Sequence, residues 1–256
     1  MRVTPIQDHI FWADKAANLS KVYKQIADLK GQTDLVVLPE MFTTGFCTDQ
    51  PDLSETMNGE TMFQLADWAK QFQFAITGSF IADDQGSLFN RAFFVFPSGE
   101  IKWADKRHLF GMSDEKTFFK SGSAPLLVEY SEFKIQVLVC YDVRFPVWAR
   151  NVNNRYDLLI YVANFPDRRI ADWDILLKAR AIENQTYVCG LNRIGIDGLG
   201  IHYNGHSALL DFKGNSLLTF PENKTSIQTY AFDKTPLDLY RKKFPVWQDA
   251  DEFEII

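Results

Sequence analysis

Two uninterrupted apolar runs constrain the fold of this chain more than any other feature of its sequence. Residues 35–38 read Leu-Val-Val-Leu, and residues 158–162 read Leu-Leu-Ile-Tyr-Val. A strand with one solvent-facing side alternates apolar and polar residues, so a continuous apolar strand is covered on both faces. The sequence therefore predicts a layered α/β structure in which these strands are buried.

Helices and further strands are expected before and after these two runs. Apolar positions at helical spacing predict helices between Asp14 and Gly31, over about 60–72 and 172–185, and shorter ones near 146–153 and 235–243. Strands are expected at 2–6, 75–81, 92–96, 101–104, 126–130, 135–140, 186–191, 205–212, 216–220 and 226–232. The polar segment 105–124 is expected to be a functional loop. Because no linker or repeat interrupts the chain, residues 1–256 are expected to form one α/β domain, with helices outside a two-sheet core.

Composition and charge exclude several classes of protein. Lys and Arg number 27 against 33 Asp and Glu, a net charge of −6, which argues against a nucleic-acid or anionic-membrane binder. Three cysteines are too few, and odd in number, for a disulfide framework. The apolar runs are far shorter than the ~20 residues that span a bilayer, and the N-terminus does not resemble a signal peptide. We therefore expect a cytoplasmic protein with free thiols.

Three reactive side chains follow three of the predicted strands. Glu40 comes after the strand at 35–38, Lys106 after 101–104, and Cys140 directly after 135–139. Since α/β sheets bind ligands beyond the carboxyl ends of their strands, the three side chains are expected to meet at one edge of the core.

This trio contains the groups that acyl transfer requires. A carboxylate accepts the thiol proton as the sulfur attacks a carbonyl carbon. An ammonium group, together with the backbone N–H that follows the nucleophile, stabilises the oxyanion. Taken alone, Cys140 fits an inert core cysteine and Glu40 with Lys106 fits a structural ion pair, but a buried pair of that kind is costly unless function requires it.

Six segments carry a resemblance to the nitrilase superfamily of carbon–nitrogen hydrolases, and within it to the omega-amidase branch. They begin Leu-Pro-Glu40-Met-Phe, Asp-Lys106-Arg-His, Leu-Val-Cys140-Tyr-Asp, Val-Ala-Asn164-Phe-Pro, Ala179-Arg-Ala-Ile-Glu and Gly205-His-Ser. The resemblance extends to about residue 247. It implies an α/β four-layer α-β-β-α sandwich without cofactor or metal, with a small-molecule amide and water as its reaction partners. It also implies a homodimer or larger homo-oligomer, and residues 244–256 are either a frayed end or an arm on a second subunit.

The same resemblance implies roles for individual residues. Glu40 would be the general base, Lys106 the oxyanion donor and Cys140 the nucleophile, while Glu115 would orient the Lys106 amine and help to place water. The implied reaction is ammonia release from small omega-amides of dicarboxylates, of the 2-oxoglutaramate or succinamate type, through a Cys thioester. The alternatives are a carbamoylase, a nitrilase or a deaminated-peptide amidase, and, in another class, a catalytically silent oligomeric binding protein.

Substrate contacts are expected from residues that follow Cys140 and from the segment around Asn164. Tyr141 would supply its N–H, and Asn164 and Phe165 would shape the pocket, although many relatives carry Trp where this chain has Phe165. Arg168 is the candidate for a substrate carboxylate, with Arg169 beside it; the alternative is a solvated surface pair. An ion pair between Asp142 and Arg144 is expected to hold the turn after the nucleophile, the alternative being a contact with substrate.

Several other motifs are assigned no part in the reaction. Cys189 is expected in the core, and Cys47, which follows Gly45-Phe46, is expected to be incidental, the alternative being a position near the pocket mouth. His202 and His206 have an i, i+4 spacing but lack a third ligand for a metal. His108 is expected to pack or hydrogen-bond in its loop, the alternative being a Cys–His dyad. The glycine-rich segment 195–200 does not open a helix, so it predicts no nucleotide site.

Overall fold

The first of two large β-sheets is built mainly from the N-terminal half of the chain, with two short strands added from residues 226–231. The computed structural model describes residues 1–255, and within them this sheet has seven strands in the order β14-β1-β2-β3-β4-β5, with β15 also paired to β1. The strands are β1 (Arg2–Gln7), β2 (Leu35–Val37), β3 (Ala75–Asp84), β4 (Ser87–Val95), β5 (Ile101–Asp105), β14 (Ser226–Ile227) and β15 (Tyr230–Ala231). β1, β2 and β3 run parallel, whereas β3, β4 and β5 form an antiparallel meander.

The second sheet is built from the C-terminal half. Within the described residues its order is β13-β12-β9-β8-β7-β6, and β7, β8 and β9 are parallel. Its strands are β6 (Leu126–Tyr130), β7 (Phe133–Val139), β8 (Leu158–Ala163), β9 (Tyr187–Asn192), β12 (Ala208–Leu210) and β13 (Ser216–Thr219). A separate hairpin joins β10 (Ile194–Ile196) to β11 (His202–Asn204).

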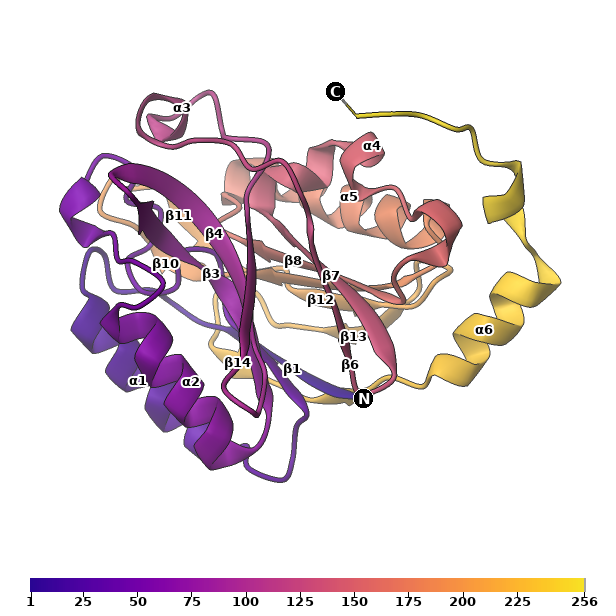
Figure 1. Cartoon of the computed structure of the whole chain (residues 1–256), viewed down its shortest axis with the longest axis horizontal. Coiled ribbons are helices and arrows are strands. Elements are labelled where there is room, and N and C mark those ends of the chain that lie inside the picture. The colour runs from indigo at the N-terminus through magenta and orange to yellow at the C-terminus, as the bar shows by residue number, and fades with distance from the viewer. Residues whose placement is uncertain (256) are drawn as a thin grey trace.

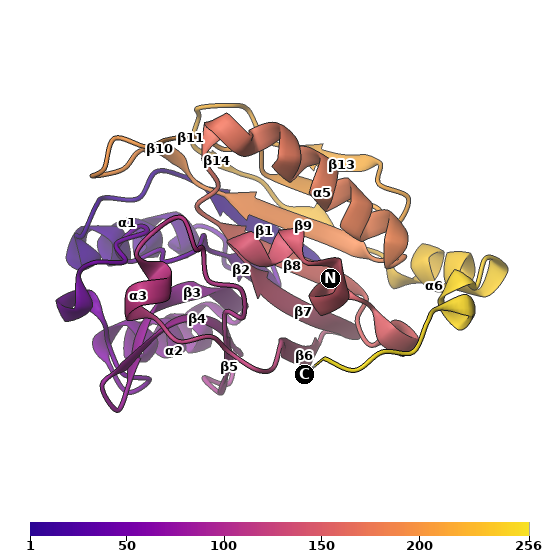
Figure 2. The same cartoon turned by 90° about the horizontal axis from the view of Figure 1, so that it is seen from above.

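Helices cover the outer face of each sheet and so make four layers, α-β-β-α. Helices α1 (Lys15–Ala27) and α2 (Glu60–Phe72) lie on the first sheet, and α5 (Ile170–Glu183) lies on the second (Figures 1 and 2). The shorter helices are α3 (Glu115–Phe118), α4 (Pro146–Ala149), η1 (Pro51–Leu53), η2 (Cys140–Arg144), η3 (Val152–Asn154), η4 (Asp167–Arg169) and η5 (Val246–Asp249). The predicted four-layer α/β sandwich is confirmed.

The continuous apolar run at β2 is explained by these layers. Leu35 and Val37 point into the core between the two sheets, whereas Val36 and Leu38 point into the core beneath α1 and α2. All four side chains are fully buried. Because side chains alternate along a strand, a strand between two apolar layers needs an apolar residue at every position.

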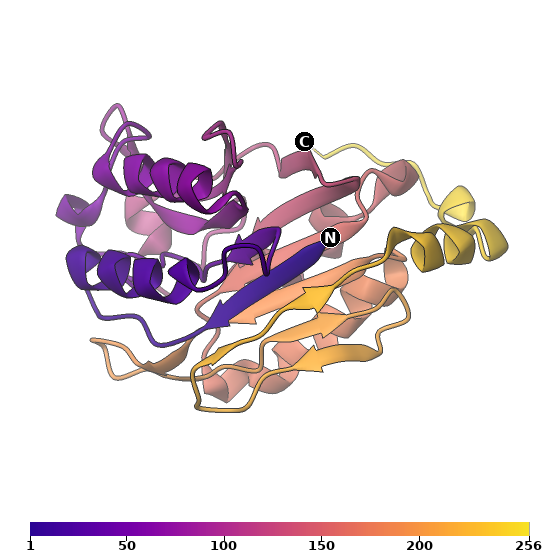
Figure 3. The same ribbon diagram turned by 90° about the horizontal axis from the view of Figure 1, so that it is seen from below.

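Helix α6 (Lys234–Lys243) lies at one end of the sandwich, and its Leu237 is buried in the core that includes the second sheet. Helix α6 is at the end of the molecule away from α1 and α2 in all three views, and the segment after it runs back toward the middle of the molecule (Figure 3). Arg241 holds α6 to the body, since its Nη1 donates to Asp157 Oδ1 at 2.7 Å and its Nε to the Gln185 carbonyl at 2.9 Å. No helix within residues 1–255 is both long and apolar enough to cross a bilayer.

Some predicted elements are shorter than their sequence patterns suggest. The helix expected at 146–153 is instead α4 followed by η3, where Asn153 adopts a left-handed φ of 53° that an α-helix cannot continue through. The strand expected at 226–232 is two short strands, β14 and β15, paired to β1 at different places. The expected loop at 105–124 contains one turn of helix, α3.

Candidate active site

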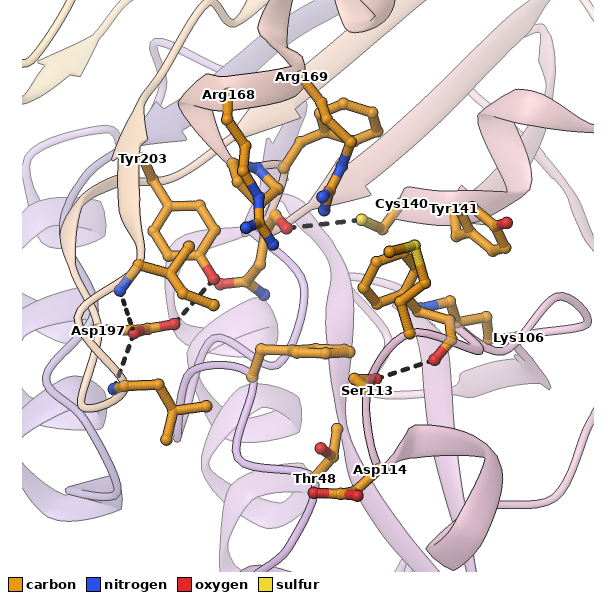
Figure 4. Close-up of a pocket in the computed structure, with 18 of the residues that line it drawn as sticks. Thr48, Lys106, Ser113, Asp114, Cys140, Tyr141, Arg168, Arg169, Asp197 and Tyr203 are labelled. Carbon is orange, nitrogen blue, oxygen red and sulfur yellow. Dashed lines mark hydrogen bonds between the residues drawn. The ribbon is translucent and has the colours of Figure 1, made fainter.

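A cavity of about 290 Å³ opens where strands of both sheets end. Glu40 follows β2, Lys106 follows β5, Cys140 follows β7 and Asn164 follows β8. The strand ends converge as expected, and Cys140 and Lys106 line one side of the cavity (Figure 4).

A tight turn presents Cys140 to the cavity. β7 ends at Val139, η2 begins at Cys140, and the backbone of Cys140 has a φ of +46°, a strained value for a non-glycine residue. Asp142 holds this turn, because its Oδ2 accepts the Val139 N–H at 3.1 Å and its Oδ1 accepts the His108 N–H at 3.1 Å. The turn also leaves the Tyr141 N–H in the first turn of η2, where amides lack a partner within the helix.

The predicted ion pair between Asp142 and Arg144 is wrong. Asp142 is buried and its carboxylate is occupied by the two backbone amides and by His108 Nδ1 at 2.8 Å. Arg144 reaches the other way, to Asp172 Oδ2 on α5 at 2.7 Å, and its guanidinium lies 5.5 Å from the Phe165 ring. The turn is therefore fixed by backbone amides and an imidazole rather than by an arginine.

Lys106 lies between two glutamates. Its Nζ is 3.0 Å from Glu40 Oε1 and 3.0 Å from each carboxylate oxygen of Glu115. Glu115, the first residue of α3, also accepts the Phe110 N–H at 2.6 Å. The side chains of all three residues are fully buried, so each charge depends on the other two and on the hydrogen bonds around them.

Asn90 connects the two glutamates and was not predicted from the sequence. Its Nδ2 donates to Glu40 Oε1 at 2.8 Å and to Glu115 Oε1 at 3.0 Å, while its Oδ1 accepts from Ser79 Oγ at 2.9 Å. The available signal was its position, because Asn90 and Arg91 are polar residues within the largely apolar strand β4. A fully buried amide at such a position needs a hydrogen-bonding partner, and here the partners are the two carboxylates.

Asn164 joins the ends of β2 and β8. Its backbone N–H donates to Glu40 Oε2 at 2.8 Å, and its Nδ2 donates to the Glu40 carbonyl at 2.7 Å. The Cys140 thiol in turn points at the Asn164 carbonyl oxygen, at 3.8 Å. Asn164 thus fixes Glu40 and contacts Cys140, in addition to lining the cavity as expected.

Burial and charge set the protonation states of this cluster. Burial, reinforced by the Glu40 carboxylate, raises the pKa of the Cys140 thiol well above its usual value. Burial alone would lower the pKa of Lys106, but the Glu115 and Glu40 carboxylates outweigh it and raise that pKa. Burial raises the pKa of Glu115, and Lys106 opposes the increase. At neutral pH the cluster therefore holds a neutral thiol beside an ammonium group.

Two arginines project into the cavity from η4. Arg168 and Arg169 both line it, and Figure 4 shows them between Cys140 on one side and Asp197 with Tyr203 on the other. Neither forms an ion pair with a carboxylate of residues 1–255, although Arg169 lies 5.0 Å from the Phe110 ring. Burial and repulsion by Arg168 lower the pKa of Arg169. Both arginines therefore border the cavity, Arg169 half-buried and Arg168 exposed.

The glycine-rich segment 195–200 forms a wall of the same cavity, which sequence reasoning did not foresee. It lies in the loop of the β10–β11 hairpin, and Asp197, Leu199, Ile201 and Tyr203 line the cavity. Asp197 organises the loop by accepting the Leu199 and Ile201 N–H groups and the Tyr203 hydroxyl, each at 2.9 Å. The segment is a turn stabilised by an aspartate side chain, and two of its glycines, Gly195 and Gly200, adopt the positive φ that the turn requires.

The remaining cysteines and histidines lie outside the reactive cluster. Cys189 is in the core, as expected, and Cys47 is fully buried with its thiol directed at the Thr44 carbonyl. His108 stacks on Phe145 at 3.7 Å and bonds to Asp142. His202 and His206 pair with different carboxylates. No group of three or more potential metal ligands occurs in the described part of the chain.

A four-layer α-β-β-α sandwich with a buried Cys, Lys and Glu cluster at the ends of its strands defines a thiol-dependent hydrolase of carbon–nitrogen bonds. The sequence comparisons agree with this class. The carbon–nitrogen hydrolase family model matches residues 2–242, and the chain belongs to that family.

Its relatives include named amidases. It is 42% identical to omega-amidase YafV of Escherichia coli strain K12, over all of this chain and 98% of that protein. It is 30% identical to the 2-oxoglutaramate amidase of Bacillus subtilis strain 168, over 84% of each. The crystal structure of XC1258 from Xanthomonas campestris, a CN-hydrolase superfamily protein with an arsenic adduct in its active site, matches with a TM-score of 0.97. XC1258 is 36% identical to this chain, and the match covers 100% of this chain and 99% of XC1258.

Proposed function

We propose that this enzyme hydrolyses omega-amides of small dicarboxylates, of the 2-oxoglutaramate or succinamate type, to ammonia and the free acid. One arrangement carries the proposal. Cys140 and Lys106 line one side of the cavity, and beside them project Arg168 and Arg169, neither of which forms an ion pair with a carboxylate of residues 1–255. Such a cavity suits a molecule with an amide at one end and a carboxylate at the other. The names of the amidase relatives support the same substrate class.

In the first step the Cys140 sulfur attacks the amide carbon. Its thiol is neutral because its pKa is raised by burial and by Glu40, so the proton must leave as the carbon–sulfur bond forms. Glu40 is the acceptor, since it is the buried carboxylate whose charge raises the pKa of the thiol. Asn164 and Asn90 hold the Glu40 carboxylate in place through its two oxygens.

The oxyanion that forms is stabilised by Lys106 and by the Tyr141 N–H. Lys106 carries a full positive charge because the two glutamates raise its pKa, and it lines the cavity beside Cys140. The fixed donors act in a buried site, where such interactions contribute most to rate. Glu115 orients the amine through two contacts of 3.0 Å.

Collapse of the tetrahedral intermediate breaks the carbon–nitrogen bond. Glu40 returns its proton to the departing nitrogen, ammonia leaves, and the acyl group remains on Cys140 as a thioester. Glu40 then takes a proton from a water molecule, whose oxygen attacks the thioester carbonyl while Lys106 again stabilises the oxyanion. The dicarboxylate leaves as the Cys140 sulfur recovers a proton from Glu40, and no cofactor is consumed.

The substrate carboxylate is held by an arginine of η4. Arg168 and Arg169 have no carboxylate partner within residues 1–255, whereas Arg144 is already paired with Asp172. A guanidinium binds a carboxylate through two parallel hydrogen bonds. Phe165, packed on Trp173 with ring centroids 5.2 Å apart, fixes the shape of the adjacent wall.

An ammonia-release panel tests this function. It comprises 2-oxoglutaramate, succinamate, glutamine, a carbamoyl amino acid and a nitrile. We expect 2-oxoglutaramate and succinamate to have the highest kcat/KM, with activity abolished by Cys140→Ala and retained by Cys189→Ala, which alters a buried thiol outside the cavity. Preference for the nitrile or the carbamoyl compound would overturn the substrate class. Substantial turnover by Cys140→Ala would overturn the nucleophile.

A second set of variants tests carboxylate recognition. Arg168→Leu and Arg169→Leu should each be measured with succinamate and with butyramide, which lacks the carboxylate. We expect at least one variant to raise KM for succinamate about tenfold or more with little change for butyramide, because a hydrogen bond to a charged group contributes roughly 1.5–3 kcal/mol. Equal effects on the two amides would remove both arginines from carboxylate binding.

We further propose that the catalytic domain spans the whole chain, functions as a homodimer and is cytoplasmic. Exposed apolar side chains on α5 and the C-terminal segment support the dimer, with Ile175 68%, Ile182 55% and Phe244 55% exposed. Residues 244–255 would form an arm on the second subunit; Ile256 lies outside the described residues. The three free cysteines support a reducing compartment.

Sedimentation velocity tests the dimer. The double variant Ile175→Asp with Ile182→Asp should yield monomers, and unchanged sedimentation would remove α5 from the proposed interface.

A further inference from the structure

The outer part of the active-site cavity is more apolar than a small dicarboxylate monoamide requires. Four side chains there form what we call the apolar rim: Phe46, Met112, Leu199 and Ile201. Met112 is 84% exposed and Leu199 66% exposed, and they come from two different loops that both border the cavity. The Phe46 ring lies only 5.4 Å from Lys106 Nζ, so the rim begins close to the reacting groups.

The loop that carries Leu199 is held firmly in place. Asp197 accepts the backbone N–H groups of Leu199 and Ile201, each at 2.9 Å. Gly198 packs so closely on Trp12 that a Cβ at this position would lie 2.2 Å from the indole Nε1. Leu199 is therefore presented to the cavity by a fixed turn, and a preformed apolar wall of this kind is typical of a ligand subsite.

The cavity also has room beyond the substrate proposed above. A monoamide of a four- or five-carbon dicarboxylate displaces on the order of four or five water molecules, roughly 120–150 Å³ at ~30 Å³ per water. The cavity measures about 290 Å³. A substrate of minimal size would leave much of the apolar rim in contact with water, whereas an apolar substituent would cover it.

The polar end of the site restricts where such a substituent is attached. The departing nitrogen must lie against Glu40, which is fully buried and held by Asn90 and Asn164. The carboxylate occupies the side where Arg168 and Arg169 project. The part of the substrate left to face the apolar rim is the carbon skeleton between its amide and its carboxylate.

Building on the proposed function, we propose that the apolar rim is a subsite for an aliphatic or aromatic branch on that carbon skeleton, with Leu199 as its specificity-determining residue. The substrate class is then a carbon-branched omega-amide, of which 2-isobutylsuccinamate is a simple representative. Each buried methylene contributes about 0.8 kcal/mol, close to fourfold in binding. A four-carbon branch that is half buried should therefore raise kcat/KM by about tenfold.

The test compares succinamate, 2-isobutylsuccinamate with its branch beside the carboxylate, and N-isobutylsuccinamate with its branch on nitrogen, whose hydrolysis releases isobutylamine instead of ammonia. Each is assayed with the wild-type enzyme, Leu199→Ala and Ile196→Ala. Ile196 is the matched control, because it is 63% exposed on the same hairpin and does not line the cavity. We expect the wild type to prefer the carbon-branched amide about tenfold. Leu199→Ala should lose most of this preference through KM, and Ile196→Ala should keep it.

The possible results separate this inference from the proposed function. If succinamate is hydrolysed but the branch slows turnover, or if Leu199→Ala keeps the preference, the subsite is refuted and the function stands. A Leu199-dependent preference for the nitrogen-branched amide would refute the assignment to the carbon skeleton. If no omega-amide is hydrolysed, the proposed function fails. Calorimetric binding of 2-isobutylsuccinamate to Cys140→Ala, with and without Leu199→Ala, then decides the subsite, and equal affinities would refute it.

Discussion

Replacing Glu115 by Gln separates the role of the second glutamate in catalysis from its role in folding. Glu115 Oε1 accepts hydrogen bonds from Asn90 and Lys106, and Oε2 accepts them from Lys106 and Phe110. Glutamine has one oxygen and one NH2 group, so either orientation points N–H groups at two donors. Lys106 then retains only Glu40 as a charged partner, at 3.0 Å.

The expected effects on stability and on rate differ in size. Three buried charges, Glu40, Glu115 and Lys106, sum to −1 in the wild type and to zero in Glu115→Gln, so no buried charge is left without a counterion. The cost in unfolding free energy is limited to the donor conflict, about 1–3 kcal/mol. The rate suffers more, because Lys106 is drawn toward Glu40 and away from the oxyanion. Losing one fixed oxyanion donor lowers kcat by roughly 10²–10³-fold.

The assay measures kcat for ammonia release at saturating 2-oxoglutaramate, together with urea unfolding of the same preparations. Glu129→Gln, at an exposed position on β6, is the matched control for the chemical change and should behave as the wild type. A folded Glu115→Gln enzyme with kcat within tenfold of the wild type would refute the orienting role of Glu115. Loss of kcat that merely follows loss of folded protein would show that Glu115 is structural.

Three further outcomes are expected. Because burial and Glu40 raise the pKa of Cys140, thiolate forms only at high pH, so alkylation of Cys140 by iodoacetamide should have its midpoint above pH 8.5 or so. Glu40→Gln removes the carboxylate repulsion and should lower that midpoint, as followed by peptide mass spectrometry; an unchanged midpoint would separate Glu40 from the thiol. Asn90→Leu should lower kcat by about 10–100-fold with little change in KM, since it frees both carboxylates, and a KM effect alone would place Asn90 in substrate binding. Lys106→Ala should lower kcat by about 10²-fold or more, and turnover within tenfold of the wild type would make Lys106 structural.

The site residues that could be predicted from the sequence are those that come after the end of a strand. Glu40 and Cys140 each follow a recognisable apolar strand, Lys106 follows the mixed polar and apolar strand β5, and the ends of these strands meet at one edge. The unbroken apolar run at Leu35 to Leu38 requires cover on both faces and so predicted a layered structure, whereas the four-layer α-β-β-α arrangement was implied by the resemblance to the nitrilase superfamily. Local patterns of this kind carry information about layers and strand ends.

The residues that were missed depend on contacts between distant segments. Asn90 lies in mid-strand, and its importance arises from carboxylates 50 and 25 residues away in sequence. The wall formed by Leu199 depends on packing of Gly198 against Trp12. The Asp142–Arg144 pair was predicted from proximity in sequence alone, and competition from backbone amides and Asp172 decided otherwise. Spacing along the chain does not encode such competition.

The central claim is that the amide is cleaved through a thioester on Cys140. The most direct measurement is the intact mass of enzyme quenched in acid during turnover of 2-oxoglutaramate, followed by mapping of the modified peptide. The account predicts one acyl group per chain on the peptide that contains Cys140, accumulating at the rate of ammonia release, and none in Cys140→Ala. An acyl group on another residue, or undiminished turnover without any acylated Cys140 peptide, would contradict it.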